Sequence, residues 1–178
     1  IGTLLAFTLY LANFFDPIQQ LSQLYNTFLS ATAALDRITN GRAVLGVGTG
    51  YREYEFKAYG TDYKRRGKRL DETLAVVRKA WATGSYEWDG EFFQFDDIPV
   101  FPPAVQQPNP PIYVGGTSPA AITRAARYGD SWFTLPMETL PVVVQLVEQY
   151  RAKCAELGRT PRICLMREAW VGEDDAAV

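Results

Sequence analysis

Residues 112–121 read Ile-Tyr-Val-Gly-Gly-Thr-Ser-Pro-Ala-Ala, and this stretch decides the fold of the chain. Its three apolar residues predict a short buried strand that ends at the glycine pair. Ser118 followed by Pro119 is typical of a helix N-cap and the first helical residue. Because a strand that passes directly into a helix is the repeating unit of α/β folds, residues 112–127 predict one βα unit.

The same alternation of strand and helix continues on both sides of this unit. The runs at 43–47, 132–134 and 162–171 predict three more strands, and helices are expected over residues 53–59, 70–81 and 140–157. Residues 86–95 predict a hairpin that turns at Asp89-Gly90, and the proline-rich residues 99–111 predict an irregular surface loop. Four strands separated by helices predict a parallel sheet with right-handed crossovers.

The bulk composition excludes several classes of function. The 178 residues are 47% hydrophobic and 21% charged, which predicts a packed core but is short for a complete eight-stranded barrel. A formal net charge of -2 gives no basic footprint for nucleic acid, and the absence of histidine excludes Ser-His-Asp catalysis and histidine-bound metals within the chain. Cys154 and Cys164 match neither a redox pair nor a zinc spacing, which favours a reducing cytoplasm.

Residues 1–38 differ in pattern from the rest of the chain. Residues 1–15 are apolar but lack the basic start of a signal peptide, and the run is too short to span a bilayer alone. Asp16-Pro17 predicts the start of an amphipathic helix that ends near residue 40. Its apolar positions, among them Phe28, Leu29, Leu35 and Ile38, recur mostly at three- and four-residue steps.

Residues 39–178 carry an ordered series of motifs. Gly-Arg-Ala-Val-Leu-Gly-Val-Gly-Thr-Gly at 41–50 is followed by Arg-Leu-Asp-Glu at 69–72, Trp-Asp-Gly-Glu-Phe-Phe at 88–93, the stretch at 112–121, and Ala-Ala-Arg-Tyr-Gly-Asp-Ser-Trp at 125–132. The series resembles the bacterial-luciferase-like monooxygenases and deazaflavin-dependent oxidoreductases. The resemblance implies an α/β fold covering roughly strands four to seven of a TIM (β/α)8 barrel. It also implies reduced FMN or a deazaflavin (coenzyme F-420) as cofactor. The family's acid/base residues lie largely on earlier strands, so the catalytic residues of this chain stay unknown.

Residues 1–38 resemble the last transmembrane helix of an ABC exporter, through Phe-Phe-Asp-Pro-Ile at 14–18 and Gln-Leu-Ser at 20–22. No Walker motif follows, so no ATPase function is expected. The chain is therefore interpreted as two parts, a helical segment at 1–38 that is foreign to the barrel and a partial barrel at 39–178.

The candidate cofactor-binding residues follow two predicted strands. Gly115, Gly116, Thr117 and Ser118 combine backbone N–H groups, the positive end of a helix and two hydroxyls, which suits a phosphate. The alternative is an ordinary strand-to-helix turn with a serine cap. Another set follows the first strand, namely Gly48, Thr49 and Gly50. Close approach of the backbone to a cofactor and simple turn geometry both explain those glycines.

Other features have a structural interpretation beside a functional one. The cationic run at 64–69 favours a solvated helix start over an anion contact. Asp71 and Glu72 are adjacent on a helix and point about 100° apart, which favours a helix-face role over a paired-carboxylate site. The aromatic residues at 88–95 favour docking of the hairpin over a substrate wall. Trp132 fits the barrel core and the cofactor pocket equally.

These features favour a flavin- or deazaflavin-dependent oxidoreductase or monooxygenase in a truncated or chimeric, weakly active form, with a small-molecule substrate and no metal. One alternative is a non-enzymatic chimeric folding or interaction module, in which residues 1–38 cover the sheet. The other is a fragment of an ABC transporter membrane domain, which is the one case that involves a membrane. Whether two chains pair as a homodimer is left open.

Overall fold

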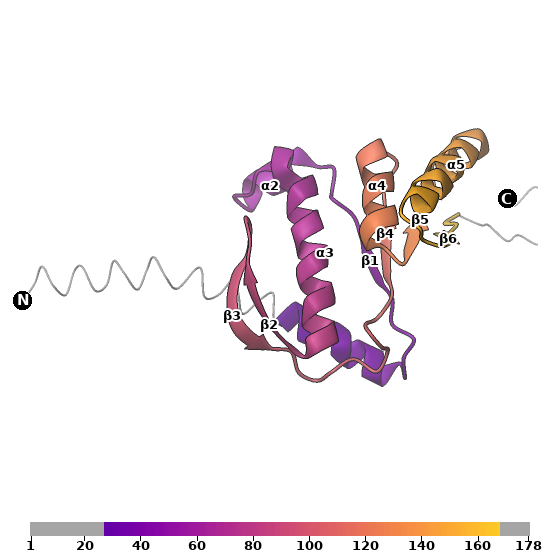
Figure 1. Cartoon of the computed structure of the whole chain (residues 1–178). Helices are drawn as coiled ribbons and strands as arrows, with labels where there is room; N and C mark the ends of the chain where they lie inside the picture. Colours follow the sequence, from indigo (N-terminus) through magenta and orange to yellow (C-terminus); the bar gives the residue numbers. More distant parts are fainter. Residues whose placement is uncertain (1–26, 168–178) are drawn as a thin grey trace, which may run out of the picture. The chain divides into compact units, whose positions relative to one another are not determined.

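The structure of the protein, a computed structural model, describes residues 27–167. Its contacts divide the chain into two compact units (Figure 1). Among the described residues, the first unit takes residues 27–43 and 75–110, and the second takes residues 44–74 and 111–167. Residues 27–38 thus belong to the same unit as residues 75–110. The proposed foreign origin of residues 1–38 stays a prediction, and the apolar run and the Asp16-Pro17 helix start lie outside the described residues.

The second unit contains a four-stranded parallel sheet. Its strands are β1 Leu45–Val47, β4 Ile112–Gly115, β5 Ser131–Phe133 and β6 Ile163–Cys164, in the order β1-β4-β5-β6. Each neighbouring pair is parallel. After β1 come α2 Glu53–Ala58, the 3-10 helix η1 Tyr63–Arg65 and α3 Arg66–Thr83, while α4 Pro119–Tyr128 and α5 Leu140–Glu156 connect the later strands. The predicted parallel sheet is confirmed.

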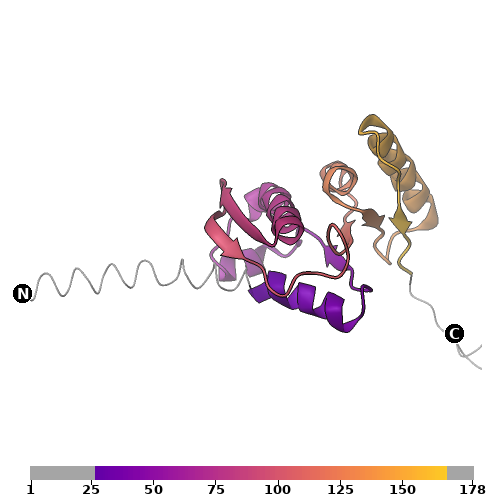
Figure 2. The same ribbon diagram turned by 60° about the horizontal axis from the view of Figure 1, so that its bottom comes forward.

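The core of this unit lies between the sheet and its helices. α4 and α5 pack against each other over the strands (Figure 2). Ile112, Val114 and Trp132 are fully buried. The Trp132 ring lies 5.7 Å from the ring of Tyr150 on α5, and its Nε1 donates to the carbonyl oxygen of Gly116 at 2.9 Å. Trp132 is therefore a core residue beneath α5 that also fixes the backbone at Gly116.

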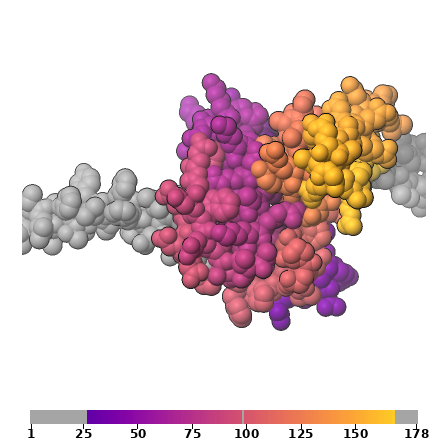
Figure 3. Space-filling view, in the orientation of Figure 1, coloured from indigo at the N-terminus to yellow at the C-terminus, as the bar shows by residue number. Residues whose placement is uncertain are grey.

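The last strand is shorter than the sequence predicts. β6 ends at Cys164, residues 165–167 are not in a strand, and the end of the predicted strand, residues 168–171, lies outside the described residues. The backbone N–H of Met166 donates to Thr134 Oγ1 at 2.9 Å. A side-chain hydroxyl thus replaces the backbone carbonyl that would continue the ladder. This segment lies at the surface (yellow in Figure 3), with Leu165 and Met166 partly exposed.

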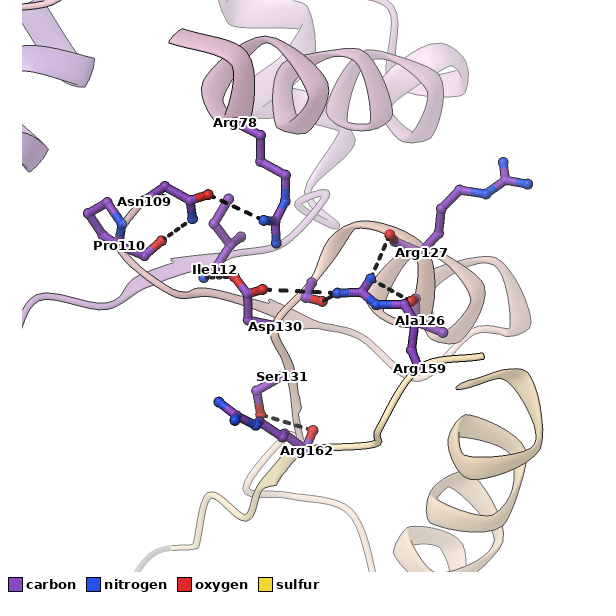
Figure 4. Close-up of polar contacts among 11 residues, drawn as sticks. Arg78, Asn109, Pro110, Ile112, Ala126, Arg127, Asp130, Ser131, Arg159 and Arg162 are labelled. Carbon is purple, nitrogen blue, oxygen red and sulfur yellow. Dashed lines mark hydrogen bonds and ion pairs between the residues drawn. The ribbon is translucent and has the colours of Figure 1, made fainter. Parts of the chain in front are cut away.

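Arg159 ties the loop after α5 to the C-terminus of α4 (Figure 4). Its Nη1 donates to the carbonyl oxygens of Ala126 at 2.8 Å and Arg127 at 2.7 Å, and its Nη2 donates to that of Gly129 at 2.8 Å. Ala126 and Arg127 belong to the last turn of α4, whose carbonyls have no internal donors, and Gly129 is the C-cap residue that follows. Arg159 therefore caps α4 at the end where β5 begins.

The first unit is built around the helix at residues 27–38, the second half of α3 and a hairpin. Leu29 and Ala33 are buried, and the carbonyl oxygen of Leu29 accepts from Trp81 Nε1 on α3 at 3.3 Å. Three residues expected on the apolar face are exposed, and the prediction is wrong for them: Phe28 (45%), Leu35 (55%) and Ile38 (80%). The prediction is confirmed for Leu29, which is buried. Ala33 and Asp36 complete the inward face, because positions 29, 33 and 36 recur at helical steps of four and three.

Asp36 on this helix holds the proline-rich connector in place. Its side chain is 0% exposed, and Oδ2 accepts from the backbone N–H groups of Val105 and Gln106 at 2.8 Å each. Gln106 Nε2 donates to Asp36 Oδ1 at 2.7 Å and to the carbonyl oxygen of Ala43 at 2.7 Å. The connector is irregular as predicted, but it is not purely a surface loop, because Ala104 is also buried.

The hairpin consists of β2 Ser85–Asp89 and β3 Gln94–Pro99. The predicted hairpin is confirmed, but its turn begins one residue later than predicted, because Asp89 still pairs with Gln94. The loop at 90–93 is closed by Gly90 N–H, which donates to Phe93 O at 2.9 Å. Phe95 is buried, with its ring 5.4 Å from that of Tyr86. The burial of Phe95 agrees with a docking role for this aromatic residue, while its contact with Tyr86 holds the two strands of the hairpin together.

Candidate functional site

A cavity lies at the carboxyl ends of β1, β4 and β5 in the second unit. Its volume is about 320 Å³. All seven predicted cofactor-binding residues line it: Gly48, Thr49, Gly50, Gly115, Gly116, Thr117 and Ser118. In parallel α/β sheets, ligands bind at this end of the strands, because the loops there are free to form a site. The structure thus brings together in one cavity two segments that are more than sixty residues apart in the sequence.

Residues 115–118 lead from β4 into the N-terminus of α4. Ser118 is the N-cap, and its Oγ accepts from the backbone N–H of Ala121 at 3.2 Å. Pro119 occupies the first helical position, where an N–H group is not needed. The prediction of a serine-capped helix start is confirmed. The positive end of α4 therefore points at the cavity, which favours an anion there.

Two of the cavity glycines have no room for a side chain. A Cβ at Gly115 would lie 2.4 Å from Phe133 Cζ, and a Cβ at Gly116 would lie 2.6 Å from Ala121 Cβ. Gly116 also has a φ of 129°, which other residues rarely adopt. Both glycines are thus required by local packing, which brings the backbone of this turn close to any bound group.

The two cavity glycines after β1, Gly48 and Gly50, have different explanations: turn geometry for one and close approach to a ligand for the other. Gly50 has a φ of 75°, so turn geometry accounts for it. A Cβ at Gly48 would meet no atom within 4 Å, so local packing does not require a glycine there. Since Gly48 lines the cavity, close approach to a ligand remains the interpretation that fits it.

Arg66 is a cavity residue that the sequence did not single out. It is the first residue of α3 and lines the cavity. Its Nη1 donates to the carbonyl oxygen of Tyr63 at 2.8 Å, and its guanidinium lies 3.7 Å from the centre of the Tyr63 ring. Its Nε is buried without a hydrogen-bond partner. This arrangement holds a positive charge at the cavity wall.

A helical signal for Arg66 exists in the sequence. Leu74 and Val77 are buried and lie eight and eleven residues after Arg66, which places all three on one helix face. Lys64, from the same cationic run, lines a separate depression beside Glu53 and Asp62. The solvated interpretation of the run therefore fails for Arg66, because α3 begins there and turns that side chain inward.

The lining of the cavity carries one cation and, within the described part of the chain, no carboxylate. Tyr51, Ala121, Phe133 and Leu135 complete the lining. Asp71 lies elsewhere, with its Oδ1 2.6 Å from Arg124 Nε in an ion pair between α3 and α4. Asp71 and Glu72 therefore do not form a paired-carboxylate site. The side chains of the described lining therefore carry a positive charge, and they include no acid/base pair for catalysis.

Two general properties of residues 27–167 bear on function. No helix in that range is both long enough and apolar enough to cross a membrane. Within the same range, no group of three His, Cys, Asp or Glu side chains is placed to hold a metal ion.

Parallel βα units with a cavity at the carboxyl ends of their strands define an α/β protein of the ligand-binding kind. Within that class, the model of the luciferase-like monooxygenases matches residues 27–178. The chain belongs to this family. The match begins at residue 27, so it includes the described part of the N-terminal helix. It gives no support to the ABC-exporter resemblance of residues 1–38.

The names of curated relatives of this chain include two kinds of cofactor, FMNH(2) and F420. The chain is 31% identical over 134 residues to an FMNH(2)-dependent dimethylsulfone monooxygenase of Pseudomonas putida, covering 74% of this chain and 37% of the relative. It is 32% identical over 157 residues to an F420-dependent hydroxymycolic acid dehydrogenase of Mycobacterium tuberculosis, covering 85% and 42%. The chain thus spans about two fifths of the length of these relatives.

Solved structures agree on the fold. Monooxygenase RslO1 from Streptomyces bottropensis superposes with a TM-score of 0.76 at 27% identity, over 85% of this chain and 48% of that one. An F420-dependent secondary alcohol dehydrogenase superposes with a TM-score of 0.68 at 19% identity, which shows the fold alone. The predicted partial TIM barrel is confirmed.

Proposed function

We propose that this chain forms part of an oxidoreductase or monooxygenase that uses reduced FMN or a deazaflavin, and that its cavity holds the phosphate of that cofactor. One observation carries the proposal: the seven predicted residues and Arg66 line a single cavity at the carboxyl ends of the strands. The FMNH(2)- and F420-dependent relatives support it.

The residues present fit a phosphate group. Arg66 has a buried Nε without a partner, and an anion in the cavity would add acceptors close to this guanidinium. The N-terminus of α4 supplies backbone N–H groups, and Thr117 and Ser118 supply hydroxyls. The glycines keep side chains away from that space.

The protein's share of the reaction is placement of the cofactor. When bound, the cofactor supplies hydride transfer or the activation of oxygen. Arg66 and the α4 N-terminus would anchor its phosphate end, while Phe133 and Leu135 exclude water from the cavity floor. We assign no catalytic residue, and we expect the 178-residue chain by itself to show little or no turnover, with a small organic molecule as substrate of the complete enzyme.

Titration of the purified chain with FMN and with coenzyme F-420, followed by cofactor fluorescence, tests the proposal. We expect submicromolar binding of one of them. The variant Arg66→Gln should weaken binding by about tenfold or more, because a charge-assisted hydrogen bond is lost. Lys68→Gln is the matched control, since Lys68 is exposed on the same helix and does not line the cavity.

Two results would count against the proposal. Binding of neither cofactor would favour the folding or interaction module instead. Equal effects of Arg66→Gln and Lys68→Gln would remove Arg66 from the site. Light scattering on the same preparation tests whether two chains pair, and a mass of two chains would establish the homodimer.

We also propose a reducing compartment, the cytoplasm, for this protein. Cys154 is buried and Cys164 is exposed, and both thiols are free. Free thiols are typical of proteins kept in a reducing environment. Fractionation of cells that produce the chain tests this, and recovery outside the cytoplasm would contradict it.

A further inference from the structure

The two groups proposed to bind the phosphate belong to different helices. Arg66 is the first residue of α3, whereas the backbone N–H groups that follow Ser118 belong to α4. Arg66 and Ser118 line the same cavity in the second unit. An anion can contact both groups only while the two helix starts keep their separation, because a hydrogen bond tolerates a change of only about 0.5 Å. The contacts that hold α3 to α4 therefore bear on the cavity.

An ion pair joins the two helices directly. Arg124 of α4 donates from Nε to Asp71 Oδ1 at 2.6 Å and from Nη2 to Asp71 Oδ2 at 3.3 Å. Two such bonds fix both the distance and the angle between a guanidinium and a carboxylate. The side chain of Arg124 is only 8% exposed, so water screens this pair less than it screens a surface pair. The pair can therefore hold the start of α3 against α4.

Gly67 allows the Arg124 guanidinium to lie against the first turn of α3. Gly67 and Asp71 are four residues apart, so they share one face of the helix. A Cβ at Gly67 would lie 2.9 Å from Arg124 Nη2, closer than real Cβ atoms come to other atoms. Gly67 directly follows Arg66 in the chain. Arg124 thus packs on the residue next to the cavity arginine.

The ion pair is not itself part of the cavity. Asp71 and Arg124 line a separate depression of about 240 Å³, and neither lines the cavity that contains Arg66. Their opposite charges offset each other, so the pair adds little net charge near a bound anion. An influence of the pair on the anion would then act through the placement of the helices.

We propose that Arg124 and Asp71 are positioning residues for phosphate binding, because their ion pair fixes the separation between Arg66 and the N-terminus of α4. This inference rests on the proposed function, which assigns the phosphate to those two groups. With the pair intact, both groups are held in place before the anion arrives, so binding does not have to order them. Without it, both groups remain but their spacing varies.

Three probes separate the phosphate from the rest of the cofactor. FMN carries a phosphate and a ring system, riboflavin carries the ring system alone, and inorganic phosphate is measured by competition with FMN. Arg124→Gln should weaken FMN and inorganic phosphate by about three- to tenfold and leave riboflavin unchanged. If coenzyme F-420 is the cofactor that binds, it replaces FMN, and its phosphate-free deazaflavin replaces riboflavin. Arg127→Gln is the matched control, because Arg127 is exposed on the same helix and the charge change is identical.

Asp71→Asn distinguishes position from charge. The substitution removes a negative charge, so Coulomb attraction alone predicts tighter binding of phosphate. The proposal predicts weaker binding, by about twofold or more, because the ion pair becomes a neutral hydrogen bond. Glu148→Gln makes the same charge change at an exposed position of α5 and should leave the affinities unaltered. Asparagine keeps the size of the side chain, so this variant remains informative if Arg124→Gln fails to fold, as thermal unfolding would show.

A double variant tests whether Arg124 acts through Arg66. Once Arg66→Gln has removed the cavity guanidinium, adding Arg124→Gln should weaken FMN by less than about twofold further. Two residues that acted independently would instead give additive losses.

The possible results are distinguishable. Unchanged FMN affinity in Arg124→Gln, or an equal loss for riboflavin, would overturn the inference, because the pair would then have no role specific to the phosphate. Tighter FMN binding in Asp71→Asn, or additive losses in the double variant, would overturn it as well. Each of these results leaves the proposed function intact, whereas binding of neither cofactor by the unaltered chain would overturn both.

Discussion

Replacing Asp36 should destabilise the protein far more than replacing an exposed aspartate. The carboxylate is buried, and it accepts two backbone N–H groups at 2.8 Å and Gln106 Nε2 at 2.7 Å. In Asp36→Asn, one oxygen can still accept the two backbone groups, but the new amide NH2 faces Gln106 Nε2. Gln106 cannot turn its amide over without losing its bond to Ala43 O. Two donors then face each other.

The magnitude follows from these contacts. One hydrogen bond to a charged group is lost, which costs about 1.5–3 kcal/mol, and the two that remain become neutral and weaker. We expect Asp36→Asn to lower the free energy of unfolding by about 2–4 kcal/mol. Asp36→Ala loses all three bonds and leaves the part-buried N–H groups of Val105 and Gln106 without this acceptor, so its effect should be larger.

The same carboxylate predicts a pH dependence. Burial raises the pKa of Asp36, but the hydrogen bonds from Gln106 and Val105 outweigh burial and hold the pKa below its usual value. The folded pKa is then lower than the unfolded one, which is about 3.9 for aspartate. The stabilisation is therefore complete above that value and is lost as the pH falls through the folded pKa.

Urea unfolding followed by tryptophan fluorescence, at neutral pH and at several values below about 5, measures both effects. Asp96→Asn is the control, since Asp96 is exposed and the charge change is identical, and its effect should stay within about 0.5 kcal/mol. A loss under about 1 kcal/mol for Asp36→Asn, or an acid limb identical to that of the unaltered protein, would refute the reasoning.

Three further predictions concern other parts of the fold. Gly116→Ala should lower the free energy of unfolding, measured by thermal unfolding, by about 2 kcal/mol or more, because its Cβ would lie 2.6 Å from Ala121 Cβ at a φ of 129°. The control Gly48→Ala, with open space around its Cβ, should lower it by under about 0.5 kcal/mol. Equal losses in the two variants would contradict the packing argument. Arg159→Ala should lower the free energy of unfolding by about 1–2 kcal/mol, because α4 loses the cap that this partly exposed side chain provides. Arg159→Lys should recover less than half of that loss in urea unfolding, because one ammonium cannot reach three carbonyls. Full recovery by lysine would mean that the charge alone stabilises the end of α4. Burial raises the pKa of Tyr86 and of Tyr150 to about 12, so both phenols should ionise late in an absorbance titration. Stability should fall between about pH 10 and 12, because the unfolded phenols ionise first, and Tyr86→Phe should lower the amplitude of the late phase by one tyrosine. The absence of a late phase would show that these rings are open to water.

The sequence identified much of the site because its main parts are backbone features. Gly115, Gly116 and the Ser118 cap are a local signal, since a strand end, a glycine pair and an N-cap follow one another directly. The sequence did not identify Arg66 as a cavity residue, because the direction of its side chain depends on where α3 begins. It did not identify Phe133 either, because the place of Phe133 in the cavity lining depends on the register that sets it beside Gly115.

The error in the predicted inward face of the helix at residues 27–38 has a physical cause. The face predicted from hydrophobicity included Leu29, which is buried, but its members Phe28, Leu35 and Ile38 are exposed. Ala33 and the polar Asp36 occupy the other inward positions. A buried carboxylate is stable there because three donors from the connector reach it. Those donors lie about seventy residues away in the sequence, so no local pattern contains them.

By itself the sequence determined the order of strands and helices, their parallel pairing and the glycine turns of the cavity, because hydrophobic period, caps and glycine conformation act over a few neighbouring residues. Only the tertiary structure decided which side chains share a space. It placed Arg66 at the cavity wall, Trp132 beneath α5 and the Phe133 ring over Gly115. Such contacts join residues that are distant in the chain, and their geometry is fixed by packing between elements and not within them.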